Sequence, residues 1–377
     1  MRSPLFCPRA SCRYHQPHTR RPANWYLSAG TYTTRAFGTV RRFRCRACGA
    51  YFSAQTFSLD YYAKRTLSYR RLLTHLITTS SIRDMARDFG VSTSTVGNKI
   101  SRLARNCLAV LQLVQHELPP AEQLCADGFE SYTLSKYFPC HINLLAGLGT
   151  QTVYWFDYVT LRRKGRMSEE QRKLRAELEK RFRADPKGLQ RSFRRLFEHL
   201  AHLICDGPRA STILFTDKHP AYRRARRRCF VINALRKQGR FAHRTVSSSE
   251  PRDRGNPLFS VNYLDRQLHK DLCEHVRKTV CHGRNVSCAM DRLVIYLVYH
   301  NLYKAYREVK GDLRTHAEVA GLERERVMQL RYGLFARRAF LSRVRPEGTI
   351  KTVWLRRYVT PLLGRPEYVP AYVRAGT

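Results

Sequence analysis

The chain contains no apolar run long enough to cross a membrane. A transmembrane helix needs about 20 mostly apolar residues, and charged residues, which make up 26% of this sequence, interrupt each apolar stretch before that length. The N-terminus also lacks the apolar core of a secretory signal peptide. We therefore expect neither a membrane protein nor a secreted one, and we predict a cytoplasmic location.

Acidic residues are scarce. The 377 residues include 29 Asp and Glu against 69 Lys and Arg, which gives a formal net charge of +40. Such an imbalance repels itself, and a polyanion relieves it because each Lys or Arg set against a phosphate releases a counterion. The composition therefore favours a nucleic-acid partner.

Internal repeats and low-complexity tracts are also missing from the sequence. Hydrophobic residues make up 43% of the chain, which is enough for a substantial core. The length is typical of two or three domains. We therefore expect a multidomain globular protein.

Two cysteine pairs near the N-terminus have the spacing of zinc ligands. One pair flanks four residues, the other flanks two, and strand-like segments lie between the pairs. Thiolates bind zinc tetrahedrally, and short loops place two sulfurs of each pair on one ion. Residues 1–65 are therefore predicted to form a zinc ribbon, with His15 and His18 as alternatives to the second cysteine. The predicted ligands of this structural Zn²⁺ are Cys7, Cys12, Cys45 and Cys48.

Residues 66–118 have the spacing of a helix-turn-helix. Ala86 is small enough for two helices to cross, Gly90 permits a tight turn, and Ser92 is a suitable N-cap for the next helix. In this motif the second helix enters the major groove of DNA. The residues predicted to face outward and contact DNA are Thr93, Ser94, Asn98 and Lys99.

Three aspartates mark a candidate catalytic domain in residues 121–310. Asp127 closes a predicted strand over 123–127, Asp217 closes an apolar strand over 212–217, and Asp265 lies on a helix expected over 262–280. The predicted order is three strands, then helix, strand, helix, strand and helix, which is typical of a ribonuclease H-like α/β fold. Carboxylates are hard oxygen ligands that suit Mg²⁺ or Mn²⁺, and paired ions of this kind support phosphodiester cleavage.

The third acid is selected by helical geometry. At about 100° per residue, Asp265 falls inside an apolar stripe, and an acid there is costly to bury unless it has a partner such as a metal. Asp271 at the edge of the stripe and Glu274 outside it remain alternatives, and Asp157 in a mid-strand position is a rival for the second acid. The stripe consists of Leu264, Leu268, Leu272 and Val276.

Prolines and charged residues indicate the other parts of the expected domain organisation. We expect a separate connecting helix over 103–114 and a domain boundary at Pro119–Pro120. Residues of about 162–205 are predicted to form a basic helical insertion, and residues 311–377 a basic tail for DNA contact or assembly. The tail aromatics are Trp354, Tyr358, Tyr368 and Tyr372.

Several segments together resemble bacterial insertion-sequence transposases of the DDE or DDD type, those that carry an N-terminal zinc ribbon and helix-turn-helix. These segments are 45–53, 90–96, 126–130, 215–217 and 262–266. The resemblance implies cleavage at element ends and strand transfer by a 3′-hydroxyl, with Mg²⁺ or Mn²⁺. It also implies element-end and target DNA as double-stranded partners, a homo-oligomer on DNA and a bacterial, nucleoid-associated location. Such families more often have Glu at the position of Asp265.

A non-catalytic function is the alternative. A DNA-binding regulator would use the same zinc ribbon and helix-turn-helix, with an inactive nuclease-like domain. The two hypotheses differ in one structural expectation, namely whether the three carboxylates converge. Convergence favours the enzyme, and scattered carboxylates favour the regulator.

Overall fold

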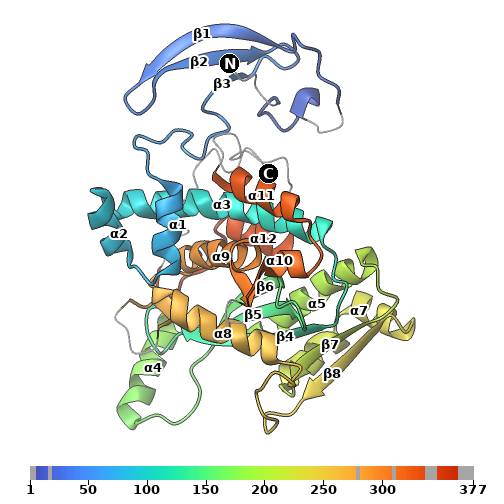
Figure 1. Cartoon of the computed structure of the whole chain (residues 1–377). Coiled ribbons are helices and arrows are strands. Elements are labelled where there is room, and N and C mark those ends of the chain that lie inside the picture. Colours follow the sequence, from blue (N-terminus) through green and yellow to red (C-terminus); the bar gives the residue numbers. More distant parts are fainter. Residues whose placement is uncertain (1–5, 16–18, 277–280, 308–310, 336–345, 364–377) are drawn as a thin grey trace.

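A five-stranded mixed sheet lies at the centre of the chain, which we describe from a computed structural model (Figure 1). The structure describes residues 6–15, 19–276, 281–307, 311–335 and 346–363. The strand order is β6-β5-β4-β7-β8, in which β5 is antiparallel to both neighbours while β4, β7 and β8 are parallel. The strands are β4 (Leu124–Tyr132), β5 (Pro139–Gly147), β6 (Val153–Thr160), β7 (Thr212–Asp217) and β8 (Phe241–Val246). The protein is therefore of the mixed α/β class.

Helices cover both faces of this sheet. Residues 140–147 of β5 are all buried, as expected for a strand that is covered on both sides. On one face, Asn143 and Asp157 contact Ser192 of α5 (Gly188–Asp206). On the other face, Phe129 of β4 contacts His269 of α8 (Phe259–Asp271). Two short helices, α6 (Pro220–Arg227) and α7 (Phe230–Lys237), connect β7 to β8.

The N-terminal module is a separate small sheet with its own aromatic core. Its antiparallel strands are β1 (Tyr26–Thr34), β2 (Gly38–Cys45) and β3 (Tyr51–Ser53). In Figure 1 this sheet lies beyond one end of the helical body. The core combines the four cysteines with buried rings, of which Trp25 and Phe52 stack with their centroids 5.6 Å apart.

The helix-turn-helix continues directly into the main core. Its helices are α1 (Tyr69–Ile77), α2 (Ile82–Phe89) and α3 (Thr93–Glu117). The prediction of a separate connecting helix over 103–114 is wrong, because α3 is one helix of 25 residues. No proline interrupts this segment, and residues 99–112 are buried throughout, so packing stabilises the helix along its length.

One continuous hydrophobic core crosses the expected domain boundary at Pro119–Pro120. It extends from Leu59 in the linker, through α3 and the central sheet, to Trp354 near the C-terminus. Helix α3 ends at Glu117, as the two prolines predict. The prolines therefore end a helix without separating two cores.

The C-terminal part is largely folded, in contrast to the expected tail. Arg105 of α3 donates a hydrogen bond of 3.0 Å to the carbonyl of Trp354, and Asn106 donates one of 2.7 Å to Leu334. Tyr368 and Tyr372 of the expected tail lie outside the described residues. The elements of this region are α9 (Val286–Leu302), β9 (Ala305–Arg307), β10 (Asp312–Thr315), α10 (His316–Val319), α11 (Arg324–Phe335) and α12 (Gly348–Trp354).

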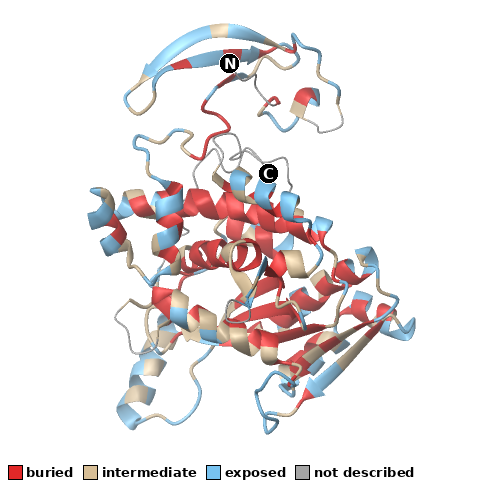
Figure 2. Ribbon diagram, in the orientation of Figure 1, coloured by how far each residue is buried: buried red, intermediate tan, exposed pale blue. Residues whose placement is uncertain are grey.

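The predicted insertion of about 162–205 divides into two different parts. Helix α4 (Glu169–Arg181) has no buried residue, and it projects from the body (Figure 2). Helix α5 instead packs into the core through a face that includes Phe193, Leu196 and Leu200. Only the α4 half therefore lies outside the core. Among the described residues, no helix combines the length and apolarity that a membrane span requires.

Candidate functional site

The parallel pairing of β4 with β7 brings two of the three aspartates to the same end of two neighbouring strands. Leu124 pairs with Leu214 and Cys125 with Phe215. Two further steps along each strand lead to Asp127 and Asp217. The expectation that the first strand ends at Asp127 is wrong, because β4 continues to Tyr132 through its pairing with β5. Asp127 instead lies just beyond the last recorded β4–β7 pair, where these two strands separate.

The third aspartate approaches from the helix that covers this face of the sheet. Residues two apart on a strand share a face, so Asp127 lies on the same face as Phe129, against α8. Asp265 is on α8 and lines a cavity of about 410 Å³. The cavity is also lined by Gly128, Phe129, Glu130, Arg252, Asn262, Arg266 and His269. Asp265 thus lines an accessible hollow beside the sheet, next to the residues that directly follow Asp127 on β4.

Like-charge repulsion links the three carboxylates. Burial raises the pKa of Asp127 to about 6, and the charge on Asp217 adds to the rise. Burial likewise raises the pKa of Asp265 to about 8, and here the charge on Asp127 adds to it. Arg252 opposes both rises. Asp127 is therefore the acid that interacts with both of the others, and the group favours a bound cation.

The alternative acids are already paired elsewhere. Asp271 accepts a hydrogen bond of 2.8 Å from the hydroxyl of Tyr296, and the buried Glu274 lies 2.9 Å from the guanidinium of Arg292. Each carboxylate is therefore balanced within its own local contacts. Burial raises the pKa of Asp265, and the charge of Asp127 raises it further.

Asp157, the alternative for the second acid of the site, has a structural role. It is buried in the middle of β6 and forms an ion pair with Arg195. Ser192 and Thr349 also donate hydrogen bonds to it. These contacts tie α5 and α12 to the sheet, and they occupy the carboxylate oxygens.

Two residues of the acidic site were not foreseen from the sequence. Arg252 lies in the loop after β8, and no periodic pattern marks it. Tyr222 of α6 is buried, and burial together with the charges of Asp127 and Asp217 raises its pKa. Its hydroxyl interaction with Asp127 lowers the pKa of that carboxyl. Both residues depend on long-range folding, so local sequence signals do not reveal them.

The four predicted cysteine ligands gather at one point. Their sulfurs all lie within 4.8 Å of one another. The Cys7 and Cys48 sulfurs are 3.6 Å apart, and those of Cys12 and Cys45 are 3.8 Å apart. Two sulfurs on one tetrahedral zinc lie about 3.8 Å apart, because each Zn–S bond is about 2.3 Å. The cluster is therefore suited to a structural metal such as zinc.

Local backbone contacts build this cysteine cluster. The amide of Gly49 donates to the carbonyl of Cys45 at 3.0 Å, and Gly49 has the positive φ of 69° that this knuckle requires. The alternative ligand His15 uses its Nδ1 atom in a contact of 2.8 Å with the carbonyl of Cys7. His18 lies outside the described residues. Cys12 therefore occupies the fourth position of the cluster.

The turn of the helix-turn-helix has the predicted caps. Gly90 adopts a left-handed conformation with φ of 62°, and the Ser92 side chain accepts from the amide of Thr95. Thr93, Ser94 and Asn98 are exposed, as expected. A hollow of about 1010 Å³ lies beside this turn, and its basic lining residues are Arg65, Arg83 and Arg87.

The prediction that Lys99 faces outward is wrong. Lys99 is only 2% exposed, and its ammonium forms an ion pair with Asp60. Three residues further along α3, Arg102 donates hydrogen bonds of 2.9 and 2.6 Å to the carbonyls of Leu59 and Tyr61. The linker after the zinc ribbon therefore covers this side of α3, and Lys99 belongs to the linker contact.

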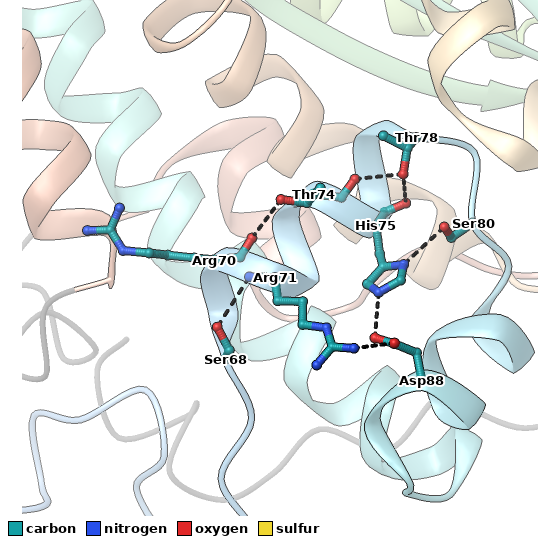
Figure 3. Close-up of polar contacts among 8 residues, drawn as sticks. All are labelled: Ser68, Arg70, Arg71, Thr74, His75, Thr78, Ser80 and Asp88. Carbon is teal, nitrogen blue, oxygen red and sulfur yellow. Dashed lines mark hydrogen bonds and ion pairs between the residues drawn. The ribbon is translucent and has the colours of Figure 1, made fainter.

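A polar cluster fixes the angle between α1 and α2 (Figure 3). The ring of His75 lies between the Ser80 hydroxyl at 3.1 Å and the Asp88 carboxylate at 2.7 Å. Arg71, one turn before His75, forms an ion pair with the same carboxylate. These contacts join the first helix to the second across the surface, and they hold α2 in place beside the exposed start of α3.

Comparisons with known proteins identify no relative. No protein-family model matches the sequence, and a comparison with curated proteins gives no match. The function is therefore inferred from the residues and their geometry.

We predict that the purified, reduced protein contains one zinc ion per chain. Replacing Cys45 with Ala should remove this zinc and make the 6–57 module sensitive to proteolysis, because a structural zinc supplies folding free energy. Metal analysis by mass spectrometry and limited proteolysis provide the measurements. Cys205→Ala, at an exposed thiol outside the cluster, is the control and should keep the zinc. Wild-type protein without zinc would refute the prediction.

The buried pair of Lys99 with Asp60 yields a stability prediction. Asp60→Ala leaves a buried ammonium without its carboxylate, which should lower the free energy of unfolding by about 3 kcal/mol. The double variant Asp60→Ala with Lys99→Met should recover much of this loss, because no buried charge remains. Urea unfolding measures both, with Glu169→Ala on exposed α4 as the control. Equal stabilities for Asp60→Ala and the wild type would show that the pair stabilises nothing.

Proposed function

We propose that this chain is a DNA transposase of the DDE type, which binds element ends and catalyses metal-dependent strand cleavage and strand transfer. The observation that supports this function best is the placement of Asp127 and Asp217 on neighbouring strands, with Asp265 of α8 near enough to Asp127 for their charges to interact. They come from segments far apart in sequence, and their charges act on one another. A half-buried group of like charges near an accessible hollow is costly for folding, which favours a role in the chemistry.

The topology of the sheet supports a ribonuclease H-like catalytic domain. The first three strands are successive antiparallel neighbours, and the fourth and fifth strands add in parallel on the other side of the first. The acids come from the first strand, the end of the fourth strand and the helix that follows the fifth. This is the arrangement that the sequence pattern predicted for a site of this kind.

The donor set suits Mg²⁺ or Mn²⁺. Asp127, Asp217 and Asp265 offer carboxylate oxygens, which hard cations prefer to sulfur or nitrogen. The carboxylates are too widely spread for all three to place an oxygen within 4.8 Å of the others, so a single ion does not fit between them as compactly as the cysteine site fits zinc. Asp127, Asp217 and Asp265 would together hold the catalytic ions. When bound, such ions activate the attacking oxygen and neutralise charge on the leaving 3′-oxygen.

The residues of the chain would hold the DNA around this centre. Arg252 and Arg266 line the same hollow as Asp265, and guanidinium groups bind phosphate through paired N–H donors. Asp127 is held in place by a hydrogen bond of 2.8 Å from the amide of Gly128 to its carboxylate. The zinc ribbon and the start of α3 would position the element end, with Thr93, Ser94 and Asn98 in the major groove.

We predict that Asp127→Asn, Asp217→Asn and Asp265→Asn each reduce strand cleavage by about 10³-fold or more, because each loses a charge that stabilises the reacting phosphate and its metal ions. Binding should stay within about threefold of the wild type, since it depends on the N-terminal modules. The substrate is a duplex selected by the wild-type protein from a random pool. Cleavage is measured with Mg²⁺ and with Mn²⁺, and binding by gel shift.

The control for this series is Asp206→Asn, at an exposed position at the end of α5, which should cleave normally. If wild-type protein binds the selected duplex tightly and cleaves nothing with either ion, the chain is a non-catalytic DNA-binding regulator. Should Asp265→Asn alone remain active, the third ligand is another acid. Full activity of all three variants would reject the proposed active site.

A further inference from the structure

A long acid-free basic segment begins directly after Asp217. Residues 218–249 contain ten Lys and Arg and no Asp or Glu. This segment forms α6, α7 and β8. The segment lies next to the proposed active site, because it starts directly after one of the three aspartates.

The arginines of this segment are crowded and exposed. Arg223, Arg224 and Arg227 of α6 are all exposed, and within the described residues none of them forms an ion pair. Burial lowers the pKa of Arg226, and the nearby charges of Arg236 and Arg227 lower it further. Helices α6 and α7 therefore bring several guanidinium groups together, and in the part of the chain that the structure describes no acid forms an ion pair with Arg223, Arg224 or Arg227. A polyanion supplies that balance.

This basic segment also contains a highly exposed phenylalanine. Phe230 is the first residue of α7, and its side chain is 87% exposed. It is the most exposed of the large hydrophobic side chains in the described part of the chain. The buried face of α7 is formed by Ile232 and Leu235, so Phe230 contributes nothing to the core. Its neighbour Val231 is also exposed, at 47%.

The distance between Phe230 and the proposed active site corresponds to a few base pairs of DNA. Helix α6 begins three residues after Asp217 and has 8 residues, so it spans about 12 Å. Its Tyr222 lies against Asp127 and Asp217, which fixes the near end of the helix at the site. Phe230 follows the far end. Along a duplex, about 12 Å corresponds to three or four base pairs, at about 3.4 Å each.

We propose that α6 and α7 form a second DNA-binding surface, in which Arg223, Arg224 and Arg227 hold the backbone of a duplex and Phe230 inserts between its base pairs. This inference rests on the proposed function, because it takes the DNA at the acidic site as the ligand. Apolar side chains that enter the base stack unstack one step and kink the duplex. A kink here would open the strand near Asp217, three or four base pairs from the cut.

The experiment for Phe230 uses duplexes that contain 2-aminopurine, whose fluorescence rises when it is unstacked. The label is placed at each position around the cleavage point of the selected duplex, with no divalent ion added. Wild-type protein should raise the fluorescence at least about twofold at positions three or four base pairs from the cut. Phe230→Ala should abolish the rise, and Phe230→Leu should keep part of it because Leu is also an effective wedge. Leu313→Ala, at a side chain 73% exposed on β10, is the matched control and should behave as wild type.

The experiment for the arginines measures how binding depends on salt. Replacing Arg223, Arg224 and Arg227 with Gln together should reduce the slope of log K against log salt by about 2 to 3, because each phosphate contact contributes about 0.9. An unchanged slope would overturn the second surface. An equal fluorescence rise for wild type and Phe230→Ala would overturn the wedge.

Two further outcomes separate this inference from others. If Phe230→Ala instead breaks an oligomer that forms without DNA, as measured by sedimentation, the exposed ring is a protein contact and the inference is wrong. If wild-type protein unstacks the labelled duplex but does not cleave it with Mg²⁺ or Mn²⁺, the DNA surface stands and the transposase proposal fails.

Discussion

The arrangement of the acidic site depends on the parallel pairing of β4 with β7. These strands are far apart in sequence, and their pairing through Cys125 and Phe215 brings Asp127 and Asp217 to the same end of the sheet. Parallel strands need a covered crossover, which here contains β5, β6, α4 and α5. Helix α8 then covers the same face and adds Asp265. A shift of one residue in this register would turn Asp127 toward the opposite face.

The basic and acidic residues of the chain lie in different parts of the structure. Some of the buried or partly buried acids are paired with a base, as Asp60, Asp157 and Glu274 are. Two other acids, Glu130 and Asp265, line the hollow beside α8. Basic residues occupy the exposed surfaces near the helix-turn-helix and along α6 and α7. Attractive potential for a polyanion thus surrounds a small acidic centre, and such a centre favours hard cations over other ligands.

The long helix α3 connects the helix-turn-helix to the region around the central sheet. Its first turn carries the exposed residues of the helix-turn-helix, and its later turns pack against α9, α11 and α12. The linker after the zinc ribbon is fixed to the same helix by Lys99 and Arg102. The start of α3 therefore has a defined position relative to the sheet, because the helix and the sheet share one core.

The sequence by itself determined the local features: the cysteine pairs, the turn at Gly90 with its cap Ser92, the strands of the sheet in their order, and the candidate acids. These follow from spacing, capping and periodicity, which act over a few residues. Tertiary structure alone decided that α3 is continuous, that Lys99 is buried against Asp60, that Trp354 belongs to the core, and that Arg252 and Tyr222 reach the acidic site. Each of these depends on contacts between distant segments, and an exposed lysine and a buried paired one have the same local sequence pattern.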